Sequence, residues 1–128
     1  MSKRKGSNAE RELVRQFWAN GWAALRAAGS GSSHYPSPDI LVGKRGRRLA
    51  IEAKLTADSR KYFPCDEIKQ LRYFADTFGA EPWVAVKFPD TPWSFFHPED
   101  LEETSKSFLA TREMVELKGL TFEEVIEG

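Results

Sequence analysis

Two acids and a lysine at short spacing are the residues of this chain whose types could hydrolyse a bond. Asp39 is followed, after twelve intervening residues, by Glu52, and Lys54 comes two positions later. Side chains alternate between the two faces of a β-strand, so Glu52 and Lys54 share one face. An antiparallel hairpin that turns at residues 44–48 would place Asp39 across from Glu52, within about 5.5 Å. Two carboxylates there could hold Mg²⁺, while Lys54 could orient or deprotonate the attacking water.

The same three residues also have a purely structural interpretation. Glu52 and Lys54 could form a surface ion pair worth about 0 to 1 kcal/mol, and Asp39 could be a turn residue after Pro38. The surroundings favour the metal site, because an apolar strand, a glycine- and serine-rich loop and a basic hairpin tip accompany the acids.

Glu10 is a third acidic candidate. Ser7 and Glu10 have the spacing of a helix capping box, in which Glu10 would bond back to the backbone of Ser7. Leu13 and Phe17 follow at helical intervals, so Glu10 also lies on the stripe expected to pack inward. A carboxylate on that stripe needs a partner, and a metal-bound water would supply one.

The elements that must position these residues follow from periodicity and from turn residues. We expect helices over residues 7–20 and 66–78, and a capping box at Thr121 and Glu124 that opens a short final helix. Strands are expected over residues 22–28, 39–43, 49–55, 82–88 and 93–96, with a mobile loop at residues 29–33. Weaker patterns indicate a helical turn at 98–103 and an edge strand at 107–110.

Composition restricts the class of protein. The chain has 128 residues, 41% hydrophobic and 30% charged, which predicts one globular domain spanning residues 1–128. We expect an intracellular protein with no membrane partner, because no stretch is apolar enough to cross a bilayer and the first residues lack a secretory signal. The single cysteine, Cys65, excludes an internal disulfide and a thiolate zinc site.

Charge is distributed unevenly along the chain. Residues 1–61 contain 13 Lys/Arg and 5 Asp/Glu, a balance of +8, whereas residues 62–128 contain 6 and 14, a balance of −8. A basic half in a neutral chain favours a face that binds a polyanion, although two ordinary solvated surfaces would give the same count. The basic residues include the arm Lys3, Arg4 and Lys5 and the hairpin residues Lys44, Arg45, Arg47 and Arg48.

Four segments resemble the archaeal-type Holliday junction resolvases, which belong to the PD-(D/E)xK nuclease superfamily. These segments are KGSNAEREL at residues 5–13, LRAAGS at 25–30, PDI at 38–40 and AIEAK at 50–54, in this order and spacing. The resemblance implies an α/β fold, with a central mixed five-stranded β-sheet flanked by helices and a restriction-endonuclease-like nuclease core. It also implies a Mg²⁺-dependent homodimer that makes paired nicks in opposing strands of four-way DNA junctions, in recombination and repair. Mn²⁺ could substitute.

The resemblance assigns roles to individual residues. Asp39, Glu52 and the Ala53 carbonyl would bind the metal, with Glu10 touching it through water, and Lys54 would assist the water. Ser30 matches an active-site serine, while Arg11 and Arg26 match basic residues that hold the scissile phosphate. The basic arm and hairpin residues above would bind duplex arms by charge. Phe74 and Phe78 match positions that pack between subunits, although their i, i+4 spacing also suits ordinary core residues.

Two other functions remain open from sequence. Another nuclease of the same superfamily, acting in restriction or repair, would share every catalytic residue. A non-catalytic module would bind junctions without cutting them, which the complete acidic set makes the weaker alternative.

Overall fold

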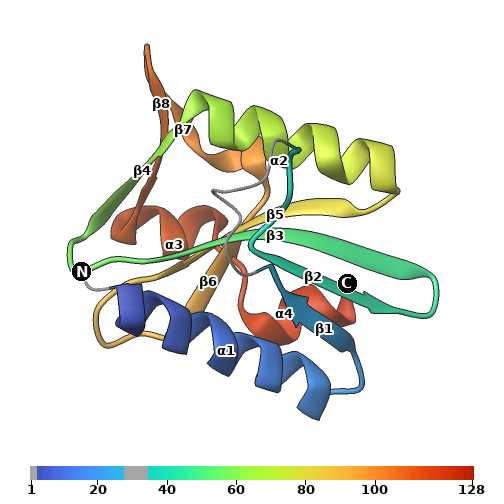
Figure 1. The fold of residues 1–128 in the computed structure, drawn as a ribbon. Helices are drawn as coiled ribbons and strands as arrows, with labels where there is room; N and C mark the ends of the chain where they lie inside the picture. Colours follow the sequence, from blue (N-terminus) through green and yellow to red (C-terminus); the bar gives the residue numbers. More distant parts are fainter. Residues whose placement is uncertain (1–2, 28–34) are drawn as a thin grey trace.

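The chain folds around a mixed β-sheet with helices on both faces (Figure 1). A computed structural model describes residues 3–27 and 35–128. The helices are α1 (Lys3–Ala19), α2 (Cys65–Phe78), α3 (Arg112–Lys118), α4 (Phe122–Glu127) and the single-turn η2 (Pro98–Asp100). The strands are β1 (Ala23–Arg26), β2 (Ile40–Lys44), β3 (Arg47–Leu55), β4 (Arg60–Pro64), β5 (Glu81–Lys87), β6 (Trp93–Phe96), β7 (Glu102–Glu103) and β8 (Ser107–Thr111). No helix within the described ranges is long and apolar enough to cross a membrane.

The predicted mixed five-stranded sheet is confirmed. Its strand order is β1-β2-β3-β5-β6, with β3 and β5 parallel and the other neighbours antiparallel. Helices α1 and α4 cover one face and α2 covers the other (Figure 1). Leu13, Phe17 and Phe122 pack into the first core, while Ile68 and Leu71 pack into the second. Because both faces of β3 are covered, its residues from Leu49 to Ala53 are all buried.

The β2–β3 hairpin has the register that the acid spacing predicted. Ile40 pairs with Ile51 and Lys44 with Arg47, so the turn is Arg45–Gly46. Gly46 has φ of 79°, a left-handed conformation that a residue without Cβ adopts at no steric cost. The tight turn leaves no freedom to shift the pairing by one residue, which would exchange the two faces of β3.

Two predictions about secondary structure need correction, and two elements were missed. Helix α1 begins at Lys3, so Ser7 lies inside it and does not cap it. Strand β8 is the middle strand of a second sheet, with order β4-β8-β7, and is not an edge strand. Its partner β4 was missed, as was α3. The predicted final helix is confirmed, because Thr121 and Glu124 form a complete capping box before α4.

Candidate active site

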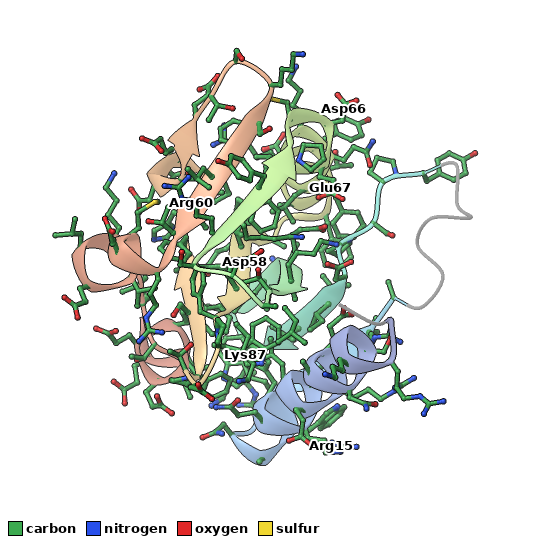
Figure 2. The ribbon with its side chains drawn as sticks, turned by 90° about the vertical axis from the view of Figure 1, so that its left-hand side faces the viewer. Arg15, Asp58, Arg60, Asp66, Glu67 and Lys87 are labelled. Atoms are coloured by element: carbon green, nitrogen blue, oxygen red, sulfur yellow. The ribbon has the colours of Figure 1, made fainter. Side chains whose placement is uncertain are left out.

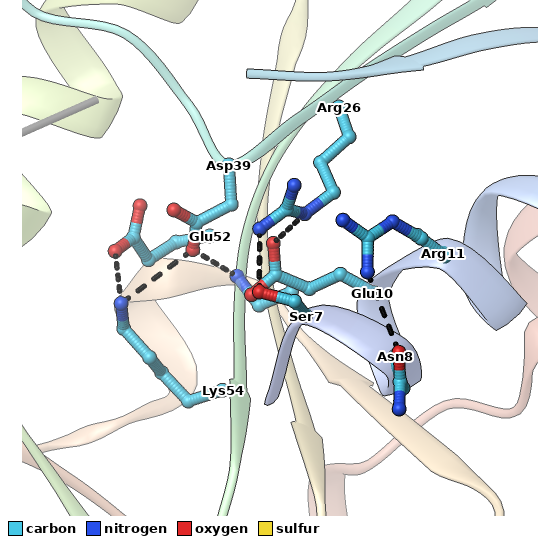
Figure 3. Close-up of polar contacts among 9 residues, drawn as sticks. Ser7, Asn8, Glu10, Arg11, Arg26, Asp39, Glu52 and Lys54 are labelled. Carbon is cyan, nitrogen blue, oxygen red and sulfur yellow. Dashed lines mark hydrogen bonds and ion pairs between the residues drawn. The ribbon is translucent and has the colours of Figure 1, made fainter. Parts of the chain in front are cut away.

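Asp39, Glu52 and Lys54 converge at the C-terminal end of β3 (Figure 3). The Lys54 Nζ atom lies 3.3 Å from Oε2 of Glu52 and 3.6 Å from Oδ2 of Asp39. Asp39 stands just before β2 and, by the hairpin register, opposite Glu52. The cross-strand meeting of the two acids that the sequence predicted is therefore present, with the lysine bridging both.

The backbone of Ala53 also faces this cluster. Its N–H donates a hydrogen bond of 2.9 Å to Oδ2 of Asp39. The N–H and C=O of one strand residue point to the same edge of the strand, so the Ala53 carbonyl is on the side of Asp39 as well. The carbonyl thus has the orientation expected of the proposed additional oxygen ligand.

Burial and like charge set the protonation of the site. Burial first, and then the Asp39 carboxylate, raise the pKa of Glu52 to about 8. Burial lowers the pKa of Lys54, but the Asp39 and Glu52 carboxylates outweigh this effect and hold that pKa above its ordinary value. Lys54 is therefore charged at neutral pH, and its charge opposes the rise in the Glu52 pKa without cancelling the effects of burial and of Asp39.

Glu10 lies beside this cluster but pairs with a different residue. Its Oε1 accepts a hydrogen bond of 3.0 Å from Nε of Arg26, and Nη2 of the same arginine donates to Oγ of Ser7 at 2.8 Å (Figure 3). Burial, followed by the charge of Asp39, raises the pKa of Glu10. The Ser7 hydroxyl and the Glu10 carboxylate therefore lie on one face of α1, and both accept hydrogen bonds from Arg26.

The donor set fits a divalent cation of the Mg²⁺ type. Within residues 3–27 and 35–128, no three His, Cys, Asp or Glu side chains gather into one metal-binding group, and the described acids meet as the pair Asp39 and Glu52. One or two carboxylates, together with water and substrate phosphate, are what Mg²⁺ takes in nuclease-type sites. Burial and the Asp39 charge, which raise the pKa of Glu52, both disfavour its ionised form, and a bound cation would oppose them.

The predicted phosphate-binding residues lie in different surroundings. Arg26 is half-buried next to the cluster, and the backbone N–H of Ala27 bonds to the carbonyl of Asp39 at 2.8 Å. Arg11 is exposed one residue beyond Glu10, and its Nη1 donates to Asn8 Oδ1 at 3.3 Å. Ser30 and the predicted mobile loop at residues 29–33 lie outside the described residues. Arg4 and Lys5 are both exposed on the first turn of α1, where only the backbone of Lys3 is described.

The basic hairpin tip is remote from the cluster. Lys44 and Arg45 are exposed at the turn, about 20 Å along β3 from Lys54 at the usual rise per residue. Arg47 is engaged inside the fold, because its guanidinium forms two hydrogen bonds of 2.8 Å with Glu81. Arg48 donates to the carbonyl of Gly79 at 3.0 Å. The tip can therefore reach only DNA that extends well beyond the cluster.

Sequence reasoning missed one acid near the site. Glu67, in the first turn of α2, raises the pKa of both Glu52 and Lys54 through its charge. An acid in the first turn of a helix is ordinarily explained by the helix dipole, so its spacing carried no signal. Only the packing of α2 against β3 brings Glu67 toward the cluster.

An apolar hollow of about 250 Å³ lies between the edge strand β1 and the end of α2. Trp18, Leu25 and Phe78 line it and are 59%, 58% and 48% exposed, which is unusual for side chains of this size. Phe78 stacks on the partly buried Phe74, with ring centroids 5.4 Å apart. The two predicted interface residues therefore differ in their surroundings: Phe74 packs against the core, whereas Phe78 is exposed.

The fold and the site together define the class of protein. A mixed sheet with helices on both faces and an Asp, Glu and Lys at the end of its central hairpin is the arrangement of the PD-(D/E)xK nucleases. A family model described as "Archaeal holliday junction resolvase (hjc)" matches residues 1–128. The chain belongs to this family of archaeal Holliday junction resolvases.

Individual relatives agree with this assignment. The chain is 44% identical, over 96% of its length and 90% of the relative's, to the crossover junction endodeoxyribonuclease Hjc of Archaeoglobus fulgidus. It is 32% identical to the Hjc of Methanocaldococcus jannaschii, over 96% of this chain and 87% of that one. The solved structure of Archaeoglobus fulgidus Hjc superposes with a TM-score of 0.87 at 42% identity, covering 94% of this chain and 98% of that chain.

Proposed function

We propose that the chain is a crossover junction endodeoxyribonuclease that resolves four-way DNA junctions by metal-dependent nicks in opposing strands. The observation that carries the chemical part is the convergence of Asp39 and Glu52 on Lys54 beside the half-buried Arg26. This arrangement supplies oxygen ligands for a cation and a guanidinium for a phosphate within one short stretch of surface. Membership of the resolvase family supports the junction as substrate.

Each site residue has a distinct task in this proposal. Asp39, Glu52 and the Ala53 carbonyl would hold Mg²⁺ or Mn²⁺, and Glu10 would contact the cation through water. When bound, the cation polarises the phosphate and lowers the pKa of water. Lys54 donates a hydrogen bond to the nucleophilic water and positions it. In the metal-free protein its raised pKa keeps the ammonium group protonated, which suits a hydrogen-bond donor.

The phosphate contacts extend outward from this centre. Arg26, fixed by Glu10 and Ser7, is placed to bind the scissile phosphate together with Arg11. Ser30 stays a predicted active-site residue. For the duplex arms we retain the positively charged residues of the arm and the hairpin, which are Lys3, Arg4, Lys5, Lys44, Arg45 and Arg48. The Glu81 ion pair makes Arg47 the least available of the predicted set.

Paired nicks require two active sites, and we propose a homodimer formed through the apolar hollow of Trp18, Leu25 and Phe78. Large exposed apolar side chains beside a free strand edge are typical of protein interfaces. We also propose that residues 1–128 act as one nuclease domain, since Phe63 and Ala110 of the second sheet share a core with Val84 of the first. A DNA junction as substrate implies an intracellular location.

A comparison of substrates tests the function. Four-way junction, flap and linear duplex of the same sequence are incubated with the protein and Mg²⁺, and the rates of cleavage are compared. We expect paired cuts in the junction and at least about tenfold slower cutting of the linear duplex. Equal cutting of both would instead favour another nuclease of the superfamily. Binding to the junction with no cutting in either Mg²⁺ or Mn²⁺ would indicate a non-catalytic module.

A further inference from the structure

A small polar hollow outside the candidate active site lies where β4 begins and β8 ends. It has a volume of about 110 Å³ and is lined by Ser59, Arg60, Thr111, Arg112 and Glu113. The backbone holds it together, because Arg60 pairs with Thr111 across the strands and the N–H of Arg112 donates to the carbonyl of Ser59 at 2.8 Å. The hollow is therefore lined by two guanidinium groups and two hydroxyl groups on hydrogen-bonded backbone.

Neither Arg60 nor Arg112 forms an ion pair with a carboxylate across residues 3–27 and 35–128, although the acid Glu113 lines the same hollow. Within the described residues, the Arg112 guanidinium has one hydrogen bond, to the carbonyl of Pro89 at 3.4 Å, and Arg60 and Arg112 are both exposed. A guanidinium group can donate two parallel hydrogen bonds to the oxygens of a phosphate group, and neighbouring hydroxyl groups can donate further ones.

The position of this hollow relates it to the active site. Arg60 follows Lys54 by six residues, a separation of at most about 20 Å. The loop between them is fixed by Thr56, whose hydroxyl donates to the carbonyl of Arg60 at 3.3 Å and accepts from the N–H of Asp58 at 3.1 Å. Asp58, Arg60 and Lys87 all lie on the face of the molecule turned toward the viewer in Figure 2.

We infer that this hollow, which we call the Arg60–Arg112 pocket, binds a backbone phosphate of a DNA arm at a distance from the cleaved bond. The inference rests on the proposed junction substrate and adds a contact that no sequence motif indicated. Successive phosphates along one strand rise about 3.4 Å, so a duplex arm held at the active site spans the distance to the pocket in several nucleotides. Arg60 also lines an adjoining hollow of about 580 Å³ that carries Asp100 and Glu102, and the charge of these acids limits the path of the arm on that side.

Salt dependence of binding tests the pocket directly. Junction affinity is measured between 50 and 300 mM salt (a range of about 6-fold) for the wild type and the Arg60→Gln/Arg112→Gln double variant. We expect binding to weaken about tenfold at physiological salt and the slope of log K against log salt to fall by about 1 in magnitude. The Arg60→Lys/Arg112→Lys variant keeps the charge and should recover the slope.

Matched controls separate this inference from the function on which it rests. Arg15→Gln removes one positive charge from an exposed residue that pairs with Glu12, and should leave both affinity and slope near wild type. Glu113→Gln removes the acid lining the pocket and should tighten binding severalfold. If the double variant keeps the wild-type affinity and slope while wild-type protein cuts junctions normally, the phosphate-binding role of the Arg60–Arg112 pocket is wrong and the proposed function stands. Wild-type protein that neither binds nor cuts junctions would overturn the proposed function.

Discussion

The backbone N–H of Ala53 donates to Oδ2 of Asp39 at 2.9 Å, so a hydrogen bond from near the C-terminal end of β3 fixes the acid that stands before β2. The same oxygen lies 3.6 Å from Nζ of Lys54. Asp39 is therefore oriented by β3 itself, independently of the loop that precedes it. This preorganisation is what a metal ligand requires, because a freely rotating carboxylate would lose entropy on binding.

Removing Arg26 should damage both stability and catalysis. The variant Arg26→Ala leaves the half-buried Glu10 without its partner, so we expect a loss of about 1 to 2 kcal/mol in the free energy of unfolding. Junction cleavage should fall at least about 100-fold, because the scissile phosphate loses a guanidinium. Urea unfolding and single-turnover cleavage measure the two effects. A variant that cuts at the wild-type rate would remove Arg26 from the phosphate site.

The stability of the metal-free protein should depend on pH through Glu52. Its pKa is about 8 in the folded chain, against an ordinary 4.5, so unfolding between these pH values releases a proton. The free energy of unfolding therefore falls as pH rises across this window, by at most about 1.4 kcal/mol per pH unit from this group. Glu52→Gln lacks the titration, and its stability relative to wild type should rise from pH 5 to pH 8.

Urea unfolding of both proteins in EDTA, at several pH values, measures that difference. Asp39→Asn is a useful comparison, because removing the like charge lowers the Glu52 pKa. The free energy of unfolding of this variant should therefore depend less steeply on pH than that of the wild type. A constant difference between Glu52→Gln and wild type from pH 5 to pH 8 would contradict the raised pKa of Glu52.

Arg47 should matter for stability more than for DNA binding. Its guanidinium pairs with Glu81, donates to the carbonyls of Val125 and Gly128, and lies 5.4 Å from the centre of the Trp22 ring. We expect Arg47→Ala to cost about 1 to 2 kcal/mol, a moderate value because solvent screens the partly exposed Glu81. Thermal unfolding measures the loss. Arg45→Ala at the exposed tip is the matched control and should leave the melting temperature unchanged.

The exposed ring of Phe78 should control assembly. Phe78→Glu places a charge in the apolar hollow and should shift a dimer toward monomer, observed by light scattering across a range of concentrations. The monomer should cut one strand of the junction at a time and should no longer make paired cuts. Phe74→Leu changes the neighbouring, partly buried ring and should leave the oligomeric state unchanged. A dimer that persists in Phe78→Glu would place the interface elsewhere.

Local patterns predicted the central part of the fold and much of the site. The hairpin register followed from the distance between Asp39 and Glu52, because a tight turn and alternating faces leave one pairing that buries the apolar side of β3. Helix α2 followed from the regular spacing of its buried residues. In both cases the interactions that decide the structure lie close together in sequence.

Contacts between distant residues account for what was missed. Ser7 and Glu10 have the spacing of a capping box, yet both bond to Arg26, 19 and 16 residues away, and α1 begins four residues earlier than Ser7. Strand β4 pairs with β8, more than 40 residues further along the chain. The local sequence pattern of either strand therefore could not show that β8 is a central strand. Glu67 approaches the cluster only through the packing of α2.

The central claim is that Asp39, Glu52 and Lys54 form the hydrolytic centre. Single-turnover cleavage of a four-way junction in Mg²⁺ by Glu52→Gln, with binding of the same junction measured in parallel, tests it most directly. We predict a loss of about 1000-fold or more in rate with junction affinity within a few-fold of wild type. A Glu52→Gln protein that makes paired cuts at the wild-type rate would contradict the claim.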